Sequence, residues 1–320
     1  MYKILITRTW PASIEAELQR RYEVTFRNRP LSVDEWREAL QQYDAVCPCV
    51  ADKLGADIFQ GLAQRKTRLV ANYGVGYNHI DIAAARQAGL AVSNTPGVLT
   101  DATADLAMTL LLMLARRAGE GERQLRAGQW QGWYPTHLMG AMVTGATLGI
   151  VGMGRIGMAM AHKAHHGFGM KILYHNRKPV QDPDVARMDA GYCGDLQDLL
   201  RRCDFVSIHC PGGAETRHMF NRDNLAQMQP HAFLINTSRG DVIDEAALVE
   251  ALDARRLAGA GLDVFEQEPQ VPAGLLRRDD VVLLPHLGSA TLATRTAMGQ
   301  RVLRNLEAFF AGDDLPDRVV

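Results

Sequence analysis

Short apolar segments alternate with helix-like stretches along the first hundred residues of the chain. The segments KILIT, EVTFR, DAVCP and RLVANY have the length and composition of buried strands. Helices are expected between them, near Ser13 to Arg21 and after Ser32. Because strands that alternate with helices form parallel sheets, this pattern predicts a small parallel α/β domain.

The alternation is interrupted at Asn94-Thr-Pro-Gly97 and then resumes over the rest of the chain. An apolar helix is expected from Thr103 to Arg117, and an aromatic loop, QWQGWYPTHLMG, follows Gly128. Further strands are expected at residues 147–151, 170–174, 204–209, 231–236, 257–264 and 281–284, and further helices at residues 155–166, 245–255 and 294–310.

A glycine-rich turn joins the strand at 147–151 to the helix that follows, in the sequence TLGIVGMGRIG. In such a Gly-x-Gly-x-x-Gly turn, Gly152 permits the tight bend, Gly154 lets the backbone approach a pyrophosphate, and Gly157 lets the helix pack closely on the sheet. The pyrophosphate is then held by N–H groups at the helix start. A glycine triple alone is a weak signal, but the strand at 170–174 completes a βαβ unit, which favours dinucleotide binding.

Two domains are expected, because 320 residues exceed the length of one small domain. The last expected helix returns the chain to the first domain, which is therefore discontinuous. We predict an α/β protein with two doubly wound parallel-sheet domains. A Rossmann nucleotide-binding domain covers residues 99–287, and a smaller, flavodoxin-like substrate-binding domain covers residues 1–98 plus 288–320.

Composition narrows the class of partner. Lys and Arg number 35 against 36 Asp and Glu, a formal net charge of −1, which gives no support to nucleic acid or an anionic membrane as the partner. No apolar run approaches the roughly 20 residues of a membrane span, and the start MYKILITRTW lacks the h-region of a secretory signal. We expect a soluble, cytoplasmic protein that acts on small molecules.

No metal site is expected. The cysteines include no C-x-x-C pair and are expected to be buried, reduced thiols: Cys47, Cys49, Cys193, Cys203 and Cys210. The Cys47-Pro-Cys49 segment has no second cluster of ligands to complete a metal site. The histidines at 162, 165 and 166 share a helical spacing but have no nearby carboxylate, which favours surface or packing roles.

Three later segments each place polar groups directly after an apolar strand, where an open parallel sheet binds its ligands. They are Asn236-Thr-Ser-Arg-Gly240, Asp263-Val-Phe-Glu-Gln-Glu-Pro269 and Pro285-His-Leu-Gly-Ser289. With GVGYNHID and the glycine turn, these segments resemble the D-isomer-specific 2-hydroxyacid dehydrogenases over essentially the whole chain. The resemblance implies that Arg239, Glu268 and His286 are the catalytic set.

The residue types suit those roles. The planar fork of Arg239 can grip a substrate carboxylate through two hydrogen bonds and polarise the adjacent carbonyl. Imidazole exchanges protons near neutral pH, so His286 can protonate the alkoxide that forms during reduction. Glu268 is expected to hold the other ring nitrogen and stabilise the imidazolium. Each residue alone could equally be a surface ion pair, a cap or a turn residue; their joint occurrence favours catalysis.

The resemblance also implies a substrate site. Backbone N–H groups at Val75 and Gly76 are expected to bind the substrate carboxylate opposite Arg239, and Ser289 is expected nearby. Without the resemblance, the glycines of this segment indicate only a turn. Trp133 matches a tryptophan that reaches a neighbouring subunit's active site in related reductases, although a core or loop-anchoring role is equally compatible. A homodimer through the nucleotide-binding domains is expected.

The coenzyme is expected to be NADP(H), with NAD(H) possible. NAD-preferring sites usually carry Asp or Glu at the end of the second strand to bind the ribose 2′-hydroxyl. Here Tyr174 is followed by His175-Asn-Arg-Lys178, so cations stand where a 2′-phosphate falls. A solvated basic turn is the alternative interpretation. The full set of expected coenzyme contacts is Thr103, Gly152, Gly154, Arg155, Ile156, Gly157, Asn176, Arg177, Lys178, Cys210, Pro211, Thr216, Thr237, Ser238, Asp263, His286 and Gly288.

Within the family, the glycine turn with ILYHNRKP, SRGDVIDE and GLDVFEQEP most resembles the glyoxylate/hydroxypyruvate reductases and the 2-ketoaldonate reductases. We therefore expect an oxidoreductase that reduces small 2-keto acids to 2-hydroxy acids of D configuration. The alternatives are a 2-ketogluconate reductase, a phosphite- or formate-type dehydrogenase, and a dinucleotide-sensing protein like the C-terminal-binding corepressors.

Overall fold

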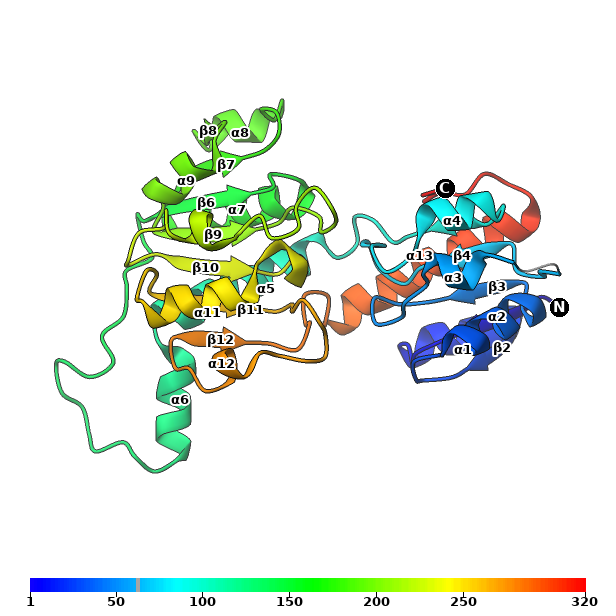
Figure 1. The fold of residues 1–320 in the computed structure, drawn as a ribbon, viewed down its shortest axis with the longest axis horizontal. Helices are drawn as coiled ribbons and strands as arrows, with labels where there is room; N and C mark the ends of the chain where they lie inside the picture. Colours follow the sequence, from blue (N-terminus) through cyan, green and yellow to red (C-terminus); the bar gives the residue numbers. More distant parts are fainter. Residues whose placement is uncertain (62–63) are drawn as a thin grey trace. The chain divides into compact units, whose positions relative to one another are not determined.

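The computed structural model describes residues 1–61 and 64–320. These residues form two compact units, each built on its own parallel sheet (Figure 1). The first unit comprises Met1–Leu99 with Ser289–Val320, and the second comprises Thr100–Gly288. The predicted fold class, two doubly wound parallel-sheet domains, is confirmed.

The first unit has a five-stranded sheet in the order β2-β1-β3-β4-β5, with every neighbouring pair parallel. This order is the flavodoxin-like one. The strands are β1 (Lys3–Ile6), β2 (Glu23–Phe26), β3 (Ala45–Cys47), β4 (Leu69–Ala71) and β5 (Ala91–Ser93). The helices are α1 (Ala12–Arg21), α2 (Val33–Gln42), α3 (Ala56–Phe59), α4 (Ile82–Gln87) and α13 (Leu292–Ala311).

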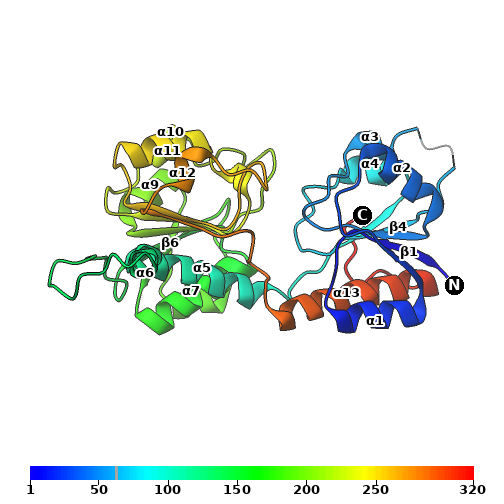
Figure 2. The same cartoon turned by 90° about the horizontal axis from the view of Figure 1, so that it is seen from below.

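Helices cover both faces of this sheet, α2, α3 and α4 on one side and α1 and α13 on the other (Figure 2). The central strands are therefore buried on both faces and read as continuous apolar runs. The helix α2 begins at a capping box, in which the Glu35 amide donates to the Ser32 hydroxyl oxygen and the Ser32 amide donates to the Glu35 carboxylate. The C-terminal segment returns to the sheet, where the Val319 amide donates to Val92.

The second unit has a seven-stranded parallel sheet in the order β12-β11-β10-β9-β6-β7-β8. Counted from β6, this is the Rossmann order with one additional strand. The strands are β6 (Thr147–Val151), β7 (Lys171–His175), β8 (Gly191–Cys193), β9 (Phe205–Ile208), β10 (Phe233–Asn236), β11 (Gly259–Leu262) and β12 (Val281–Leu283).

Two apolar cores lie on opposite faces of this sheet. One face is covered by α5 (Thr100–Ala115) and α7 (Arg155–Phe168), as Figure 2 shows, whereas α6 (Ala118–Arg126) follows α5 and buries none of its residues. The other is covered by α9 (Leu196–Arg202), α10 (Arg222–Leu225), α11 (Glu245–Asp253) and α12 (Ala273–Leu276), and a short helix α8 (Pro183–Arg187) precedes β8. Two strands at the ends of the sheets, β5 and β8, were not among the expected elements, and neither were α6 and the short helices α3, α4, α8, α9, α10 and α12.

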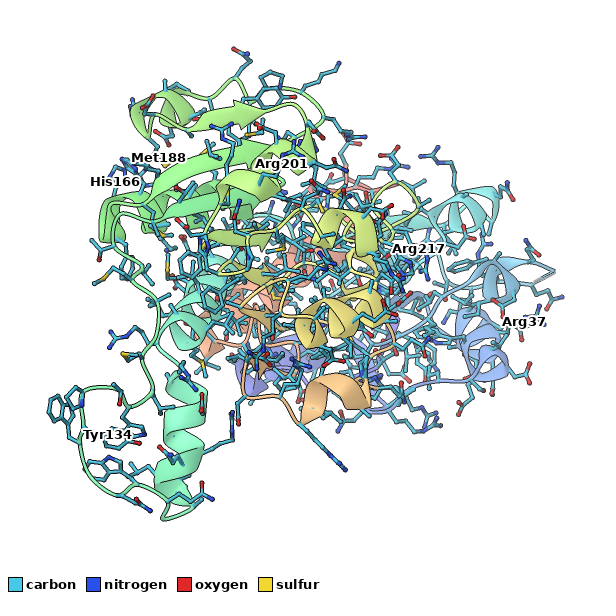
Figure 3. All side chains as sticks on the ribbon, turned by 60° about the vertical axis from the view of Figure 1, so that its left-hand side comes forward. Arg37, Tyr134, His166, Met188, Arg201 and Arg217 are labelled. Carbon is cyan, nitrogen blue, oxygen red and sulfur yellow. The ribbon has the colours of Figure 1, made fainter. Side chains whose placement is uncertain are left out.

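No described helix is both long enough and apolar enough to cross a lipid bilayer. All five cysteines are free thiols, and four of them are buried. No group of three or more His, Cys, Asp or Glu side chains among the described residues is arranged to hold a metal ion. His166 lies at the margin of the second unit (Figure 3), in ring contact with His162 and His165.

Candidate active site

The strand ends of the second unit bring the predicted catalytic segments to one edge of its sheet. Arg239 follows β10, Glu268 lies in the loop after β11, and His286 follows β12. These three strands are neighbours and parallel, so their carboxyl ends lie side by side. Open parallel sheets bind ligands at this edge.

His286 and Glu268 form a direct pair. The His286 Nδ1 lies 2.9 Å from Glu268 Oε2, and the Phe265 amide donates to the other oxygen, Oε1, at 3.1 Å. Burial alone raises the pKa of Glu268. The hydrogen bond and charge of His286, with the Phe265 amide and Arg239, nevertheless hold that pKa below its ordinary value. Glu268 is thus an ionised acceptor that fixes the imidazole and leaves Nε2 for a reacting group.

A buried carboxylate orients the backbone that carries His286. Asp263 is fully buried, and it accepts hydrogen bonds from the amides of Leu287 at 2.6 Å and Gly288 at 2.8 Å. The His286 amide donates to the Asp263 carbonyl at 2.8 Å. These three bonds hold His286 in the left-handed region, with φ +55°, which is uncommon for a residue with a side chain. Burial raises the pKa of Asp263.

Arg239 lies on a turn that a buried asparagine shapes. The side chain of Asn236, fully buried at the end of β10, donates to the Arg239 carbonyl at 2.8 Å and accepts from the Ser238 amide at 3.0 Å. Burial lowers the pKa of Arg239, and the carboxylates of Glu268 and Asp241 oppose that effect. A guanidinium stays charged at any physiological pH, so the site keeps a partly buried cation beside the His286–Glu268 pair.

The glycine turn after β6 has the geometry that the sequence predicts. Gly152 has φ +99°, and a Cβ there would lie 2.5 Å from the Cys210 amide nitrogen. A Cβ on Gly157 would lie 2.2 Å from the Gly152 carbonyl oxygen, so only glycine lets α7 approach the turn. A Cβ on Gly154 would meet open space, which leaves the first turn of α7 accessible to a ligand.

Other expected coenzyme contacts lie at the same edge. The Thr237 hydroxyl is buried and has no hydrogen-bond partner among the described residues, as expected of a group that binds a ligand. Asn176 accepts from the Met153 amide at 2.7 Å and so ties the end of β7 to the glycine turn. Thr103 donates to the Gly288 carbonyl at 3.1 Å. These features fit a dinucleotide, for which Ile156, Cys210, Pro211 and Ser238 also remain proposed contacts.

The end of β7 carries cations and no carboxylate of its own. Arg177 instead pairs with Glu215, from the loop after β9, at 2.8 Å. In the described part of the chain, Arg155 and Lys178 form no ion pair. Thr216, next to Glu215, donates to the Pro211 carbonyl at 2.6 Å. The sequence pattern did not reveal Glu215, because it lies 38 residues from Arg177.

The expected substrate loop lies in the first unit, after β4. Asn72 donates to the carbonyls of Gly74 and Gly76 at 3.0 Å, and Asn94 donates to the Val75 carbonyl at 2.8 Å. Within the described residues, the amides of Val75 and Gly76 donate no hydrogen bond to the chain. The carbonyls of this loop are thus directed onto Asn72 and Asn94, and the N–H groups of Val75 and Gly76 have no acceptor among the described residues. Ser289 also belongs to the first unit.

Trp133 is not a core residue. It lies on the loop after α6, with 83% of its surface exposed, on the same exposed segment as Tyr134 (Figure 3). Trp130, Met139 and Met142 on this loop are also exposed. The anchoring role that the sequence left open is therefore excluded for the single chain.

Comparison with known proteins identifies the family. Residues 108–288 match the family model described as "D-isomer specific 2-hydroxyacid dehydrogenase, NAD binding domain". The chain belongs to this family. The resemblance inferred from the sequence is thereby confirmed.

Among its dehydrogenase relatives is a glyoxylate reductase of Thermococcus litoralis, 43% identical over 99% of this chain and 96% of that protein. A solved structure of the NADPH-dependent glyoxylate/hydroxypyruvate reductase of Sinorhizobium meliloti, in complex with NADP and malonate, is 35% identical. It covers 100% of this chain and 97% of that one, with a TM-score of 0.89. The solved structure of a glyoxylate reductase from Paecilomyes thermophila is 32% identical. The match covers 99% of this chain and 98% of that one, with a TM-score of 0.87.

Replacing Gly157 by alanine tests the close approach in the glycine turn. The added Cβ would push α7 from the turn, and overpacking typically costs about 1–3 kcal/mol, so we expect coenzyme affinity to fall by roughly tenfold or more. A fluorescence titration with reduced coenzyme measures the dissociation constant. The matched control is Gly167→Ala on the exposed end of the same helix, where a Cβ meets open space. Equal affinities in the two variants would contradict the packing argument.

Replacing Glu268 by glutamine tests the pairing with His286. Glutamine keeps a hydrogen-bonding oxygen but removes the negative charge that lies 2.9 Å from His286 Nδ1. The ring then delivers its proton to the alkoxide without an opposing charge to stabilise it, so kcat for keto-acid reduction is expected to fall by roughly tenfold or more, while coenzyme affinity changes little. Steady-state kinetics and a coenzyme titration measure the two quantities. An unchanged kcat would exclude the role assigned to Glu268.

Proposed function

We propose that this dehydrogenase reduces small 2-keto acids, glyoxylate and hydroxypyruvate, to 2-hydroxy acids of D configuration, with NADPH as its preferred coenzyme and NADH as an alternative. The observation that carries the proposal is the His286–Glu268 pair beside Arg239, at the sheet edge where the glycine turn opens. Relatives of similar length named glyoxylate reductase support the substrate class.

The bound nicotinamide would supply the hydride. Arg239 would hold the substrate carboxylate and polarise its keto oxygen, because its guanidinium is a permanent, partly buried cation. His286 would deliver a proton from Nε2 to the forming alkoxide, while Glu268 fixes Nδ1 and offsets the charge of the ring. The first unit would act as the substrate-binding domain, in which the amides of Val75 and Gly76 bind the carboxylate from the loop after β4.

The preference for NADPH rests on the charges at the end of β7. Arg177 and Lys178 stand where an adenosine 2′-phosphate is held in folds of this type, and Arg155 begins α7 nearby. The structure of the S. meliloti reductase is of an NADPH-dependent enzyme in complex with NADP. Because β7 itself ends in no carboxylate, one source of repulsion against the phosphate is absent.

A substrate and coenzyme panel tests this function directly. Glyoxylate, hydroxypyruvate, pyruvate and 2-ketogluconate are each assayed with NADPH and NADH, and kcat/KM is compared. We expect turnover of the two small keto acids, with NADPH the better coenzyme. His286→Asn is expected to remove most of that turnover while coenzyme still binds. Turnover of 2-ketogluconate alone would overturn the assignment of small keto acids as substrates. A clear preference for NADH would overturn the coenzyme assignment. No turnover of any substrate would favour a dinucleotide-sensing binding protein.

We further propose that two copies associate through their nucleotide-binding units. The loop after α6 exposes a group of large apolar side chains, which in a monomer would remain in water: Trp130, Trp133, Tyr134, Met139 and Met142. It extends away from the sheet of its own unit (Figure 1). Such patches are typical of protein interfaces.

Light scattering tests the association. The unmodified protein is expected at about twice the 35.3 kDa chain mass. Met142→Glu, on a side chain that is 78% exposed, is expected to weaken the dimer by placing a charge in the interface. Leu276→Glu, on α12 and 59% exposed, is the control outside the loop. A monomeric unmodified protein at micromolar concentration would exclude the dimer.

A further inference from the structure

An ion pair bridges the two loops that flank the dinucleotide crevice. The strand β6 lies between β7 and β9, and Val151 is in register with His175 on one side and Ile208 on the other. Arg177 follows β7 and Glu215 lies in the loop after β9, with 2.8 Å between Arg177 Nη1 and Glu215 Oε2. This is the point where the strand order reverses, at which Rossmann folds bind dinucleotides.

Hydrogen bonds fix the backbone on both sides of this pair. On the Glu215 side, the Thr216 amide donates to the Gly213 carbonyl at 3.0 Å, and the Gly213 amide donates to Asp241 at 3.1 Å. On the Arg177 side, the Tyr192 hydroxyl donates to the Asn176 carbonyl at 3.1 Å. The two paired side chains themselves are 87% and 79% exposed, so they can rearrange without moving either loop.

Of the three cations near this point, Arg155, Arg177 and Lys178, only Arg177 takes part in an ion pair among the described residues. Arg155 and Lys178 form no ion pair within the described part of the chain, whereas Arg177 already has a carboxylate partner. A 2′-phosphate on the adenosine would need the guanidinium of Arg177, and Glu215 both competes for that group and repels the added negative charge. A ribose with a free 2′-hydroxyl carries no charge there and meets neither penalty.

We propose that Glu215 is a coenzyme-selectivity residue that weakens NADPH binding through Arg177 and leaves NADH binding nearly unchanged. The proposal rests on the proposed use of Arg177 for the 2′-phosphate. It assigns to a carboxylate from the loop after β9 part of the discrimination that the acid at the end of the second strand supplies in NAD-preferring folds. The difference between the affinities for NADPH and NADH is thereby reduced, so that both coenzymes can be used.

The experiment is a set of coenzyme titrations on the full-length protein. Glu215→Gln is expected to lower the dissociation constant of NADPH by about two- to fivefold, the range typical of exposed ion pairs, and to change that of NADH by less than about 1.5-fold. The gain should shrink at about 0.5 M salt, because exposed charges are screened. Glu250→Gln is the matched control, since Glu250 is an exposed partner of Arg222 on α10 and α11. Unchanged or weaker NADPH binding in Glu215→Gln would overturn the proposal.

A second background shows whether the effect runs through Arg177. In Arg177→Ala, the added Glu215→Gln change is expected to give a smaller gain in NADPH affinity, because only the direct repulsion between Glu215 and the phosphate is then relieved. An equal gain in both backgrounds would overturn the proposed route. The two hypotheses fail separately. If Arg177→Ala reduces NADPH binding but Glu215→Gln does not improve it, only the role of Glu215 is wrong; if Arg177→Ala leaves NADPH binding unchanged, the phosphate assignment fails, and this proposal fails with it.

Discussion

The carboxylate of Asp263 organises the edge of the second unit's sheet where the proposed catalytic residues lie. It is buried without an ion-pair partner among the described residues, and two backbone amides offset part of its desolvation. Those amides belong to Leu287 and Gly288, so the bonds that satisfy Asp263 also set the chain direction at His286. The left-handed backbone there, unfavourable by itself, is the means by which the imidazole reaches Glu268. The hydrogen bonds that stabilise the buried carboxylate of Asp263 therefore also set the backbone geometry at His286, the proposed proton donor.

Asparagine plays a similar part in three other loops that carry proposed site residues. Asn236 closes the turn that presents Arg239, Asn72 closes the loop that presents the amides of Val75 and Gly76, and Asn176 ties β7 to the glycine turn. An amide side chain can donate and accept at once, so one residue can satisfy both a carbonyl and an N–H of an irregular loop. Such loops need satisfied backbone groups if they are to hold ligand-binding geometry beside a buried sheet.

The sequence revealed features that depend on local order and missed those that depend on distant pairing. The glycine turn and the residues after β10, β11 and β12 were predictable, because strand ends and glycine spacing are visible along the chain. The strands β5 and β8 have only three residues each, too few to show a period, and α6 is largely polar and buries none of its residues, so apolar runs did not mark any of the three. The carboxylate contacts of Asp263 and the pairing of Arg177 with Glu215 join residues 24 or more apart, which no local pattern encodes.

The two cations to which we assign ligand contacts, Arg239 and Arg177, differ in how far water screens their charge. At the proposed catalytic end, Arg239 is partly buried, so little water screens the charge of its guanidinium. At the end where we propose that the adenosine binds, Arg177 and Glu215 are largely exposed, so their attraction is weak and Arg177 can exchange Glu215 for another anion. The first arrangement suits a group that must act on every substrate in the same way. An exposed, weak ion pair suits a group whose partner changes with the coenzyme. A single change of charge there can alter coenzyme selectivity without disturbing the residues around Arg239.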